Sequence, residues 1–222
     1  MPLQNSPSMT SNNDDVPKRI DSHYIIHELR HILHFEKGIL FTIKALFLHP
    51  GKSIRQFLTE DRSRLVKPVL FLVLTSLLYT SFIHLFHIQN AHQQTAVKEW
   101  VATHYGYANI IMGIFIGLWL KLLFRKSSYN FFEILIMLCF VMGSGMLIFA
   151  IFALIQGLTQ TDLASLSAIV SVLYCVWAIA QFINGRKPLN YLLSAVAYLL
   201  GMASFSILTS AISALIDAFH KG

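Results

Sequence analysis

The sequence predicts an all-α integral membrane protein, in which a five-helix transmembrane bundle follows a cytoplasmic, amphipathic N-terminal segment. Of the 222 residues, 55% are apolar and 13% are charged, whereas a soluble domain has about 25% charged residues. The apolar residues form long runs, and most Lys and Arg residues fall between those runs. No polar stretch after residue 68 is long enough for a second folded unit, so one membrane domain is predicted.

The first 67 residues are expected to form a tail and then elements at the membrane surface. Residues 1–20 are rich in Ser, Asn, Asp and Pro and lack the apolar core of a signal peptide, which predicts a disordered tail. Residues 21–67 are predicted to form cytoplasmic, interfacial amphipathic helices. Residues 23–34 have one apolar face, and residues 38–48 are apolar but too short to span, so both are expected among the lipid headgroups.

A third short helix is expected after a turn at Pro50-Gly51. It would begin with Ser53 as its N-cap and end near Leu58. The charged residues 60–62 would then lead to the first crossing. All three short helices are therefore predicted outside the hydrocarbon layer.

Five later segments are long and apolar enough to cross the bilayer. A helix needs about 20 residues to span roughly 30 Å of hydrocarbon. The segments cover about 68–88, 107–124, 131–158, 163–184 and 191–216, and residues 217–222 would form a short external tail. Because the third segment is long, we expect it to be tilted or broken, with a bend at Gly143-Ser144-Gly145.

The basic residues predict the orientation, because Lys and Arg accumulate in cytoplasmic loops. Ten of the 17 precede the first crossing, and five flank the two later turns on that side: Lys121, Arg125, Lys126, Arg186 and Lys187. Only Lys98 and Lys221 lie opposite. This 15 to 2 split predicts a cytoplasmic N-terminus, an external C-terminus and contact with the anionic inner leaflet. The net charge of +6 thus reflects topology, and no nucleic-acid partner is predicted.

The stretch from Phe35 to Pro68 carries a recognisable pattern. It reads Phe35-Glu36-Lys37-Gly38, then Thr42, then residues 50–55 (PGKSIR) and residues 60–68 (EDRSRLVKP) before an apolar helix. This pattern resembles the bacterial membrane family catalogued as domain of unknown function 3667. The resemblance implies a bacterial cytoplasmic membrane and marks these candidate functional residues: Gly38, Thr42, Pro50, Gly51, Arg55, Arg62, Arg64, Lys67 and Pro68. Many relatives carry a preceding cysteine-rich piece, but this chain has no cysteine there, so that piece's metal role does not carry over.

Catalytic motifs are missing from the sequence. Gly51-Lys52-Ser53 ends like a phosphate-binding loop, but Leu46 stands where that loop needs a glycine. Four histidines, His23, His27, His31 and His34, have the spacing of one helix face, yet they suit the wet side of an interfacial helix better than a metal site. We predict no catalytic, cofactor-binding or metal-binding residue.

Polar groups within the crossings are few and therefore informative. Glu133 is expected to pair with Arg125 or Lys126, and Gln156 and Gln181 are expected to hydrogen-bond between helices. Small residues at four-residue spacing predict close helix packing: Gly113 and Gly117 on the second crossing, Ala197 and Gly201 on the fifth. A homodimer through Gly113 and Gly117 is the alternative role of that pair.

Three functions stay open from the sequence. The favoured hypothesis is a non-enzymatic module that binds membrane lipids through its basic segment, or else a protein partner or a second copy. A small transporter or channel would use Glu133, Gln156 and Gln181 along a wet path. An enzyme acting on a lipid or polyprenyl substrate would need Arg62, Arg64, Glu133 and Arg186 to converge around a pocket.

Overall fold

The computed structural model describes residues 38–88 and 105–221. Within these ranges all regular structure is helical, and no strand occurs. The predicted tail over residues 1–20 and the predicted helix over residues 23–34, with its four histidines, lie outside the described residues. Residues 35–68, which carry the family pattern, are called the signature segment. Its part from Gly38 onward and the long helices make up the described fold.

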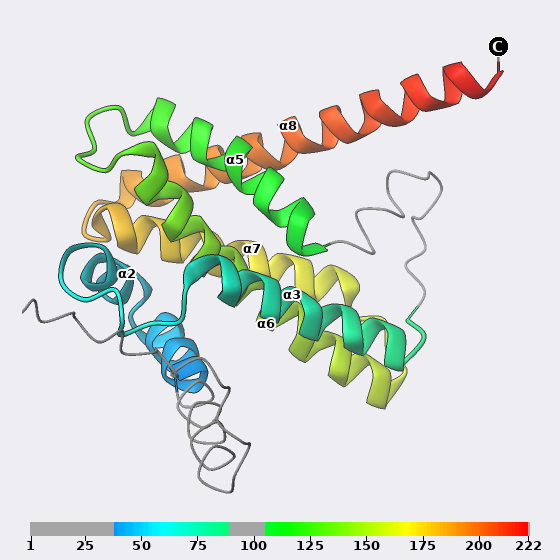
Figure 1. Cartoon of the computed structure of the whole chain (residues 1–222), viewed down its shortest axis with the longest axis horizontal. Coiled ribbons are helices and arrows are strands. Elements are labelled where there is room, and N and C mark those ends of the chain that lie inside the picture. Colours follow the sequence, from blue (N-terminus) through cyan, green and yellow to red (C-terminus); the bar gives the residue numbers. More distant parts are fainter. Residues whose placement is uncertain (1–37, 89–104, 222) are drawn as a thin grey trace, which may run out of the picture. The chain divides into compact units, whose positions relative to one another are not determined.

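The described helices follow one another in a simple order (Figure 1). They are Gly38–Leu48, α2 (Pro50–Thr59), α3 (Pro68–Leu85), α5 (Tyr105–Leu123), α6 (Phe131–Thr159), α7 (Ala164–Asn184) and α8 (Pro188–Lys221). From α3 onward, each of the five is long and apolar enough to cross a membrane. The predicted fold class is confirmed. α3 ends three residues before the predicted crossing does, and α8 extends at both ends beyond the predicted one.

α6 is the central helix of this part of the chain. In its most apolar stretch 72% of the residues are buried, compared with 11% for α8. The helix runs without interruption through Gly143 and Gly145, so of the two alternatives for this segment, tilted or broken, it is not broken here. A Cβ on Gly143 would meet the Phe71 ring and Leu72 of α3, and one on Gly145 would meet Ser171 of α7. These glycines let α3 and α7 pack closely on α6.

Small residues also bring α5 against α6 and α8. Gly113 lies beside the Met142 sulfur, and Gly117 faces the Phe131 and Leu135 side chains, all of α6. A Cβ on Gly201 of α8 would overlap the backbone of α5, and Ala197 one turn earlier is fully buried. α6 of the same chain covers Gly113 and Gly117, so this pair serves helix packing within the chain.

A capping box starts α6. The Asn130 side chain accepts a hydrogen bond from the Glu133 amide at 2.9 Å, and the Glu133 carboxylate accepts one from the Asn130 amide at 2.7 Å. The box satisfies two backbone donors that otherwise have no partner at a helix start. The predicted pairing with Arg125 or Lys126 is therefore wrong, since the Glu133 carboxylate is used by its own helix terminus.

Replacing Asn130 by Ala is expected to lower the free energy of unfolding by about 1 kcal/mol, since the N-cap acceptor is lost. Glu133→Gln keeps an acceptor at the third position of the box and is expected to cost much less. Unfolding in mixed micelles of mild detergent and dodecyl sulfate measures both. A larger loss for Glu133→Gln than for Asn130→Ala would show that the charge, and not the cap, matters.

Candidate functional site

The signature segment packs on the long helices instead of lying apart from them. Leu46 and Ile54 are fully buried, and the Phe57 ring meets the Phe140 ring of α6 edge-on with 5.1 Å between centroids. The Tyr174 hydroxyl of α7 donates to the Leu46 carbonyl oxygen at 3.3 Å. One side of the Gly38–Leu48 helix is thus covered by protein.

Thr42 joins two parts of the signature. Its side chain is fully buried. The Thr42 hydroxyl donates to the Gly38 carbonyl oxygen at 2.8 Å and accepts from the Val66 backbone amide at 3.0 Å. Val66 stands just before α3, so this one side chain fixes the Gly38–Leu48 helix to the start of the first long helix. A hydroxyl serves this place because it donates and accepts at once.

Gly51 and Arg55 fasten α2 to the end of α7. A Cβ on Gly51 would overlap the Gln181 carbonyl group, so the two backbones lie in direct contact. The Arg55 guanidinium donates to the Gln181 and Phe182 carbonyl oxygens at 2.7 and 2.9 Å. The last four carbonyls of a helix lack partners within the helix, and the C-terminal dipole favours a cation. Arg55 of α2 supplies the C-terminal end of α7 with hydrogen-bond donors and with a positive charge.

The start of α2 differs from the prediction. α2 begins at Pro50, and His49 is its N-cap. Ser53 lies inside the helix, where its hydroxyl donates to the Ala45 carbonyl oxygen at 3.0 Å. Proline favours the first helical position because it has no amide hydrogen to satisfy there. The chain therefore changes direction at His49, and Pro50 with Gly51 forms the first turn of the helix.

The second half of the signature shapes the link to α3. The Ser63 amide and hydroxyl donate to the Asp61 carboxylate at 2.8 and 2.6 Å, which lowers the pKa of Asp61. The Arg64 guanidinium donates to the Gln56 side chain at 3.2 Å and lies over the Phe41 ring.

The other three signature residues of this half have simpler roles. Arg62 and Lys67 are exposed, and Lys67 is the N-cap of α3. Pro68 is the first residue of that helix.

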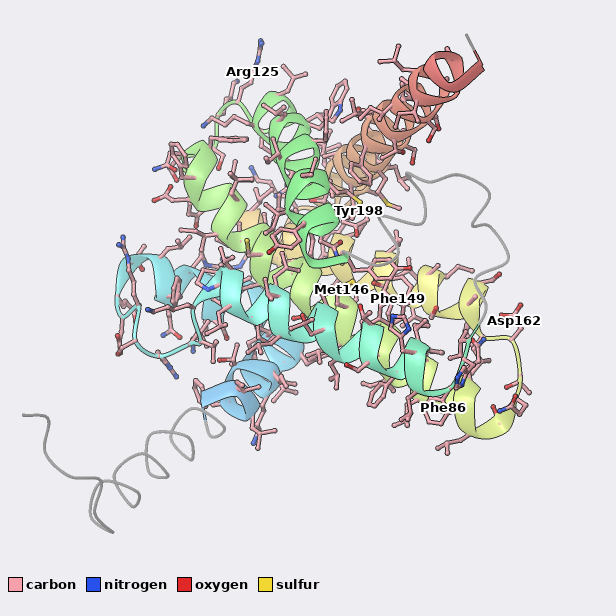
Figure 2. The ribbon with its side chains drawn as sticks, turned by 45° about the vertical axis from the view of Figure 1, so that its right-hand side comes forward. Phe86, Arg125, Met146, Phe149, Asp162 and Tyr198 are labelled. Carbon is pink, nitrogen blue, oxygen red and sulfur yellow. The ribbon has the colours of Figure 1, made fainter. Side chains whose placement is uncertain are left out.

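A basic hollow of about 520 Å³ lies between the α5–α6 loop and the α7–α8 turn. Its described lining includes Arg125, Lys126 and Lys187, all exposed, and no acidic residue. Figure 2 shows Arg125 pointing outward from the loop. The Asn190 amide also lines the hollow and donates to the Asn184 carbonyl oxygen at 2.8 Å, which holds the turn.

Two contacts fix the α5–α6 loop beside α7. The Lys121 ammonium donates to the Tyr129 carbonyl oxygen at 2.8 Å, and the Tyr129 ring packs on the Phe182 ring with 4.3 Å between centroids. Lys121 is thus engaged within the chain, while Arg125 and Lys126 remain at the rim of the hollow. The sequence assigned these cations to topology, and Arg125 or Lys126 also to an ion pair with Glu133. It did not predict that they meet around a hollow, because their meeting depends on how the two helical hairpins pack.

The three polar residues proposed for a transport path do not meet. Glu133 belongs to the capping box at the start of α6. Gln156, near the other end of α6, accepts from the Leu163 amide at 3.2 Å. The Gln181 amide donates to the Tyr191 hydroxyl at 2.9 Å, a bond between α7 and α8. No described cavity contains all three residues.

The basic and acidic groups proposed for an enzyme share none of the described cavities. Arg62 and Arg64 follow α2, Glu133 starts α6, and Arg186 follows α7. None of the four lines a described cavity. The arrangement therefore gives the enzyme hypothesis no support from these residues.

The fold defines a multi-pass helical membrane protein with five candidate spans. Residues 36–80 match the family model described as Protein of unknown function (DUF3667), which confirms the resemblance drawn from residues 35–68. The match covers the Gly38–Leu48 helix, α2 and most of α3. No curated protein and no solved structure matches this chain.

Proposed function

We propose that this protein is a non-enzymatic membrane module that binds the phosphate headgroups of anionic lipids at its basic end. The observation that carries the proposal is the hollow where Arg125, Lys126 and Lys187 meet without an acidic residue in its described lining. Lys and Arg bind phosphate oxygens by charge-assisted hydrogen bonds. Basic pockets between membrane helices are suited to anionic headgroups for this reason.

The surroundings of the hollow suit a lipid better than a soluble anion. Leu123 and Ile183 form its apolar part. Leu122 and Leu189, the chain neighbours of the lining residues Leu123 and Asn190, are 48% and 60% exposed and offer apolar surface to acyl chains. A soluble phosphate would gain only the polar contacts, whereas a lipid would also remove apolar surface from water.

The same proposal includes an orientation. The signature segment contacts the end of α7 through Arg55, and the hollow adjoins that end through Asn184. Both basic regions therefore belong to the same end of α7, as the positive-inside rule requires of one membrane side. We place this end at the anionic cytoplasmic leaflet of a bacterial inner membrane, with the C-terminus outside.

The test compares lipid retention in native mass spectrometry of the full chain in mild detergent. The variant Arg125→Gln/Lys126→Gln/Lys187→Gln is expected to retain phosphatidylglycerol at least about tenfold less than the unchanged protein, since each cation near an anionic headgroup contributes about 1 kcal/mol. Phosphatidylcholine, which has no net charge, serves as the reference lipid. The difference between the two lipids is expected to shrink at high salt because ions screen exposed charges.

A control variant removes the same charge elsewhere. Lys52→Gln/Arg62→Gln/Lys67→Gln changes three exposed cations that do not line the hollow. Its phosphatidylglycerol retention is expected to stay within about twofold of the unchanged protein, since the hollow's contacts are intact. Equal losses in both triple variants, or equal retention of both lipids by the unchanged protein, would contradict a specific site.

A further inference from the structure

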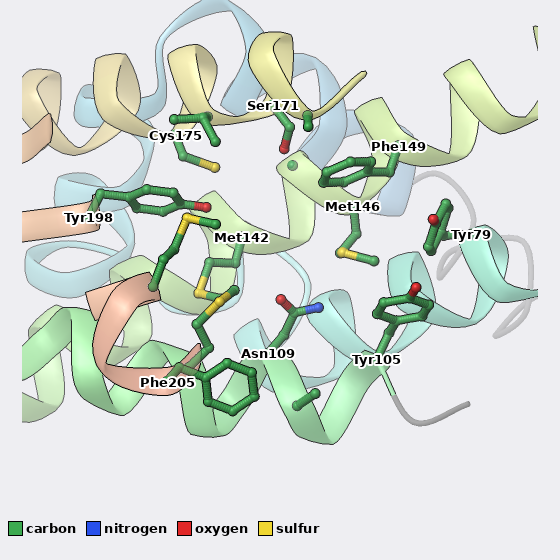
Figure 3. Close-up of a pocket in the computed structure, with 16 residues that line it drawn as sticks. Tyr79, Tyr105, Asn109, Met142, Met146, Phe149, Ser171, Cys175, Tyr198 and Phe205 are labelled. Atoms are coloured by element: carbon green, nitrogen blue, oxygen red, sulfur yellow. The ribbon is translucent and has the colours of Figure 1, made fainter. Parts of the chain in front are cut away.

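An internal cavity lies among α3, α5, α6, α7 and α8 (Figure 3). It shares no lining residue with the basic hollow. Its volume is about 290 Å³, roughly twice that of a cavity which holds benzene. Aromatic and methionine side chains form much of its wall, among them Tyr79, Met142, Met146 and Phe149. None of the described residues that line it is charged, so its chemistry suits a neutral, mainly apolar occupant.

One polar group in the wall, the Asn109 amide, has no hydrogen-bonding partner within the part of the chain that the structure describes. The Asn109 side chain is 7% exposed. Figure 3 shows its amide directed into the cavity, towards the side on which Ser171 and Tyr198 also present hydroxyl groups. Within residues 38–88 and 105–221 no hydrogen bond of the Asn109 amide occurs. The amide opens onto the cavity, where the mainly apolar wall supplies no hydrogen bond, so a ligand that accepts one gains free energy there. Such a group calls for a ligand that supplies the missing hydrogen bond.

We propose that this cavity binds the ring head group of a neutral membrane lipid that bears a carbonyl oxygen, the class to which lipid quinones belong. The Asn109 amide donates to the carbonyl oxygen. Flat rings pack well against aromatic faces and thioether sulfurs, which the Tyr and Met residues of the wall supply. The volume limits the occupant to a head group of one or two rings, so its apolar tail has to leave the cavity.

An exit for such a tail exists between α7 and α8. Ala168 of α7 lines the cavity and is exposed, and Phe205 of α8 lines it and is half-buried. The cavity therefore reaches the outer surface of the helices at this point. Since α7 and α8 are both candidate membrane spans, the opening faces the place where lipid chains would be. A membrane-dissolved ligand thus has a lateral route that a water-soluble one lacks.

The experiment uses two probes with the same ten-carbon tail on a six-membered ring. Decylubiquinone has ring carbonyl oxygens and a ten-carbon tail, while decylbenzene has the tail and a ring without oxygen. Native mass spectrometry and thermal unfolding of the full chain in mild detergent measure binding of each. The unchanged protein is expected to bind decylubiquinone more tightly, and Asn109→Leu is expected to weaken that binding about tenfold while leaving decylbenzene unaffected, since only the hydrogen bond is removed.

A second variant tests the route and keeps Asn109 intact. Ala168→Trp fills the opening and is expected to abolish binding of decylubiquinone, whereas Ala164→Trp, one turn earlier on α7 and outside the cavity lining, is expected to leave it unchanged. The proposal is overturned if Asn109→Leu weakens both probes equally or neither, or if the unchanged protein binds neither probe. These outcomes do not depend on the basic hollow, so they leave the proposed function in place.

Discussion

Gly51→Ala is expected to loosen the signature segment from the membrane helices and to lower the free energy of unfolding by about 1–3 kcal/mol. The added methyl group would overlap the carbonyl of Gln181 and the amide nitrogen of Phe182, and both belong to the backbone of α7. A backbone within a helix cannot move aside as a flexible side chain can. α2 would therefore have to retreat, and Arg55 would lose its hydrogen bonds to the same turn.

A second glycine of the signature provides the control. A Cβ on Gly38 would meet only the Val66 side chain, at the ordinary contact distance of 3.8 Å. Gly38→Ala is thus expected to be neutral or slightly stabilising, since alanine favours helix more than glycine does. Thermal unfolding in mild detergent compares the two variants. If Gly51→Ala is as stable as Gly38→Ala, the close approach of α2 to α7 does not exist in the protein.

Arg55→Ala is expected to cost about 2–3 kcal/mol, because two carbonyl oxygens at the end of α7 lose a charged donor. Arg55→Lys keeps the positive charge at the helix terminus and is expected to recover part of the loss. It recovers only part because the ammonium group on a shorter side chain does not reproduce the guanidinium geometry. Unfolding in mixed detergent and dodecyl sulfate micelles measures the three proteins.

Arg62 is the matched control for Arg55. It belongs to the same signature and is exposed. Arg62→Ala is therefore expected to change the free energy of unfolding by less than about 0.5 kcal/mol. The difference between the two alanine variants separates the cap on α7 from the general effect of removing a cation. If Arg55→Ala and Arg62→Ala have equal stability, the role of Arg55 as a cap on the C-terminal end of α7 is contradicted.

The sequence determined the class of the protein and its five long helices. Length and hydropathy of an apolar run are local properties, and the bilayer requires a helix wherever such a run crosses it. The signature segment was also recognisable in the sequence, and residues 36–80 match the family model. What the signature does structurally was not visible there, because Arg55 contacts a turn 126 residues further along the chain.

The tertiary structure alone decided which polar groups meet. Asn109 of the second crossing faces an apolar cavity, and Glu133, which was expected to form an ion pair, caps its own helix. The basic hollow likewise exists only because two loops, separated by the whole of α6 and α7, come together. Lipid is as apolar as the helices, so hydrophobicity selects the spans but not their neighbours. The neighbours of each helix are selected by side-chain shape and by a few small residues, and a single sequence specifies these contacts poorly.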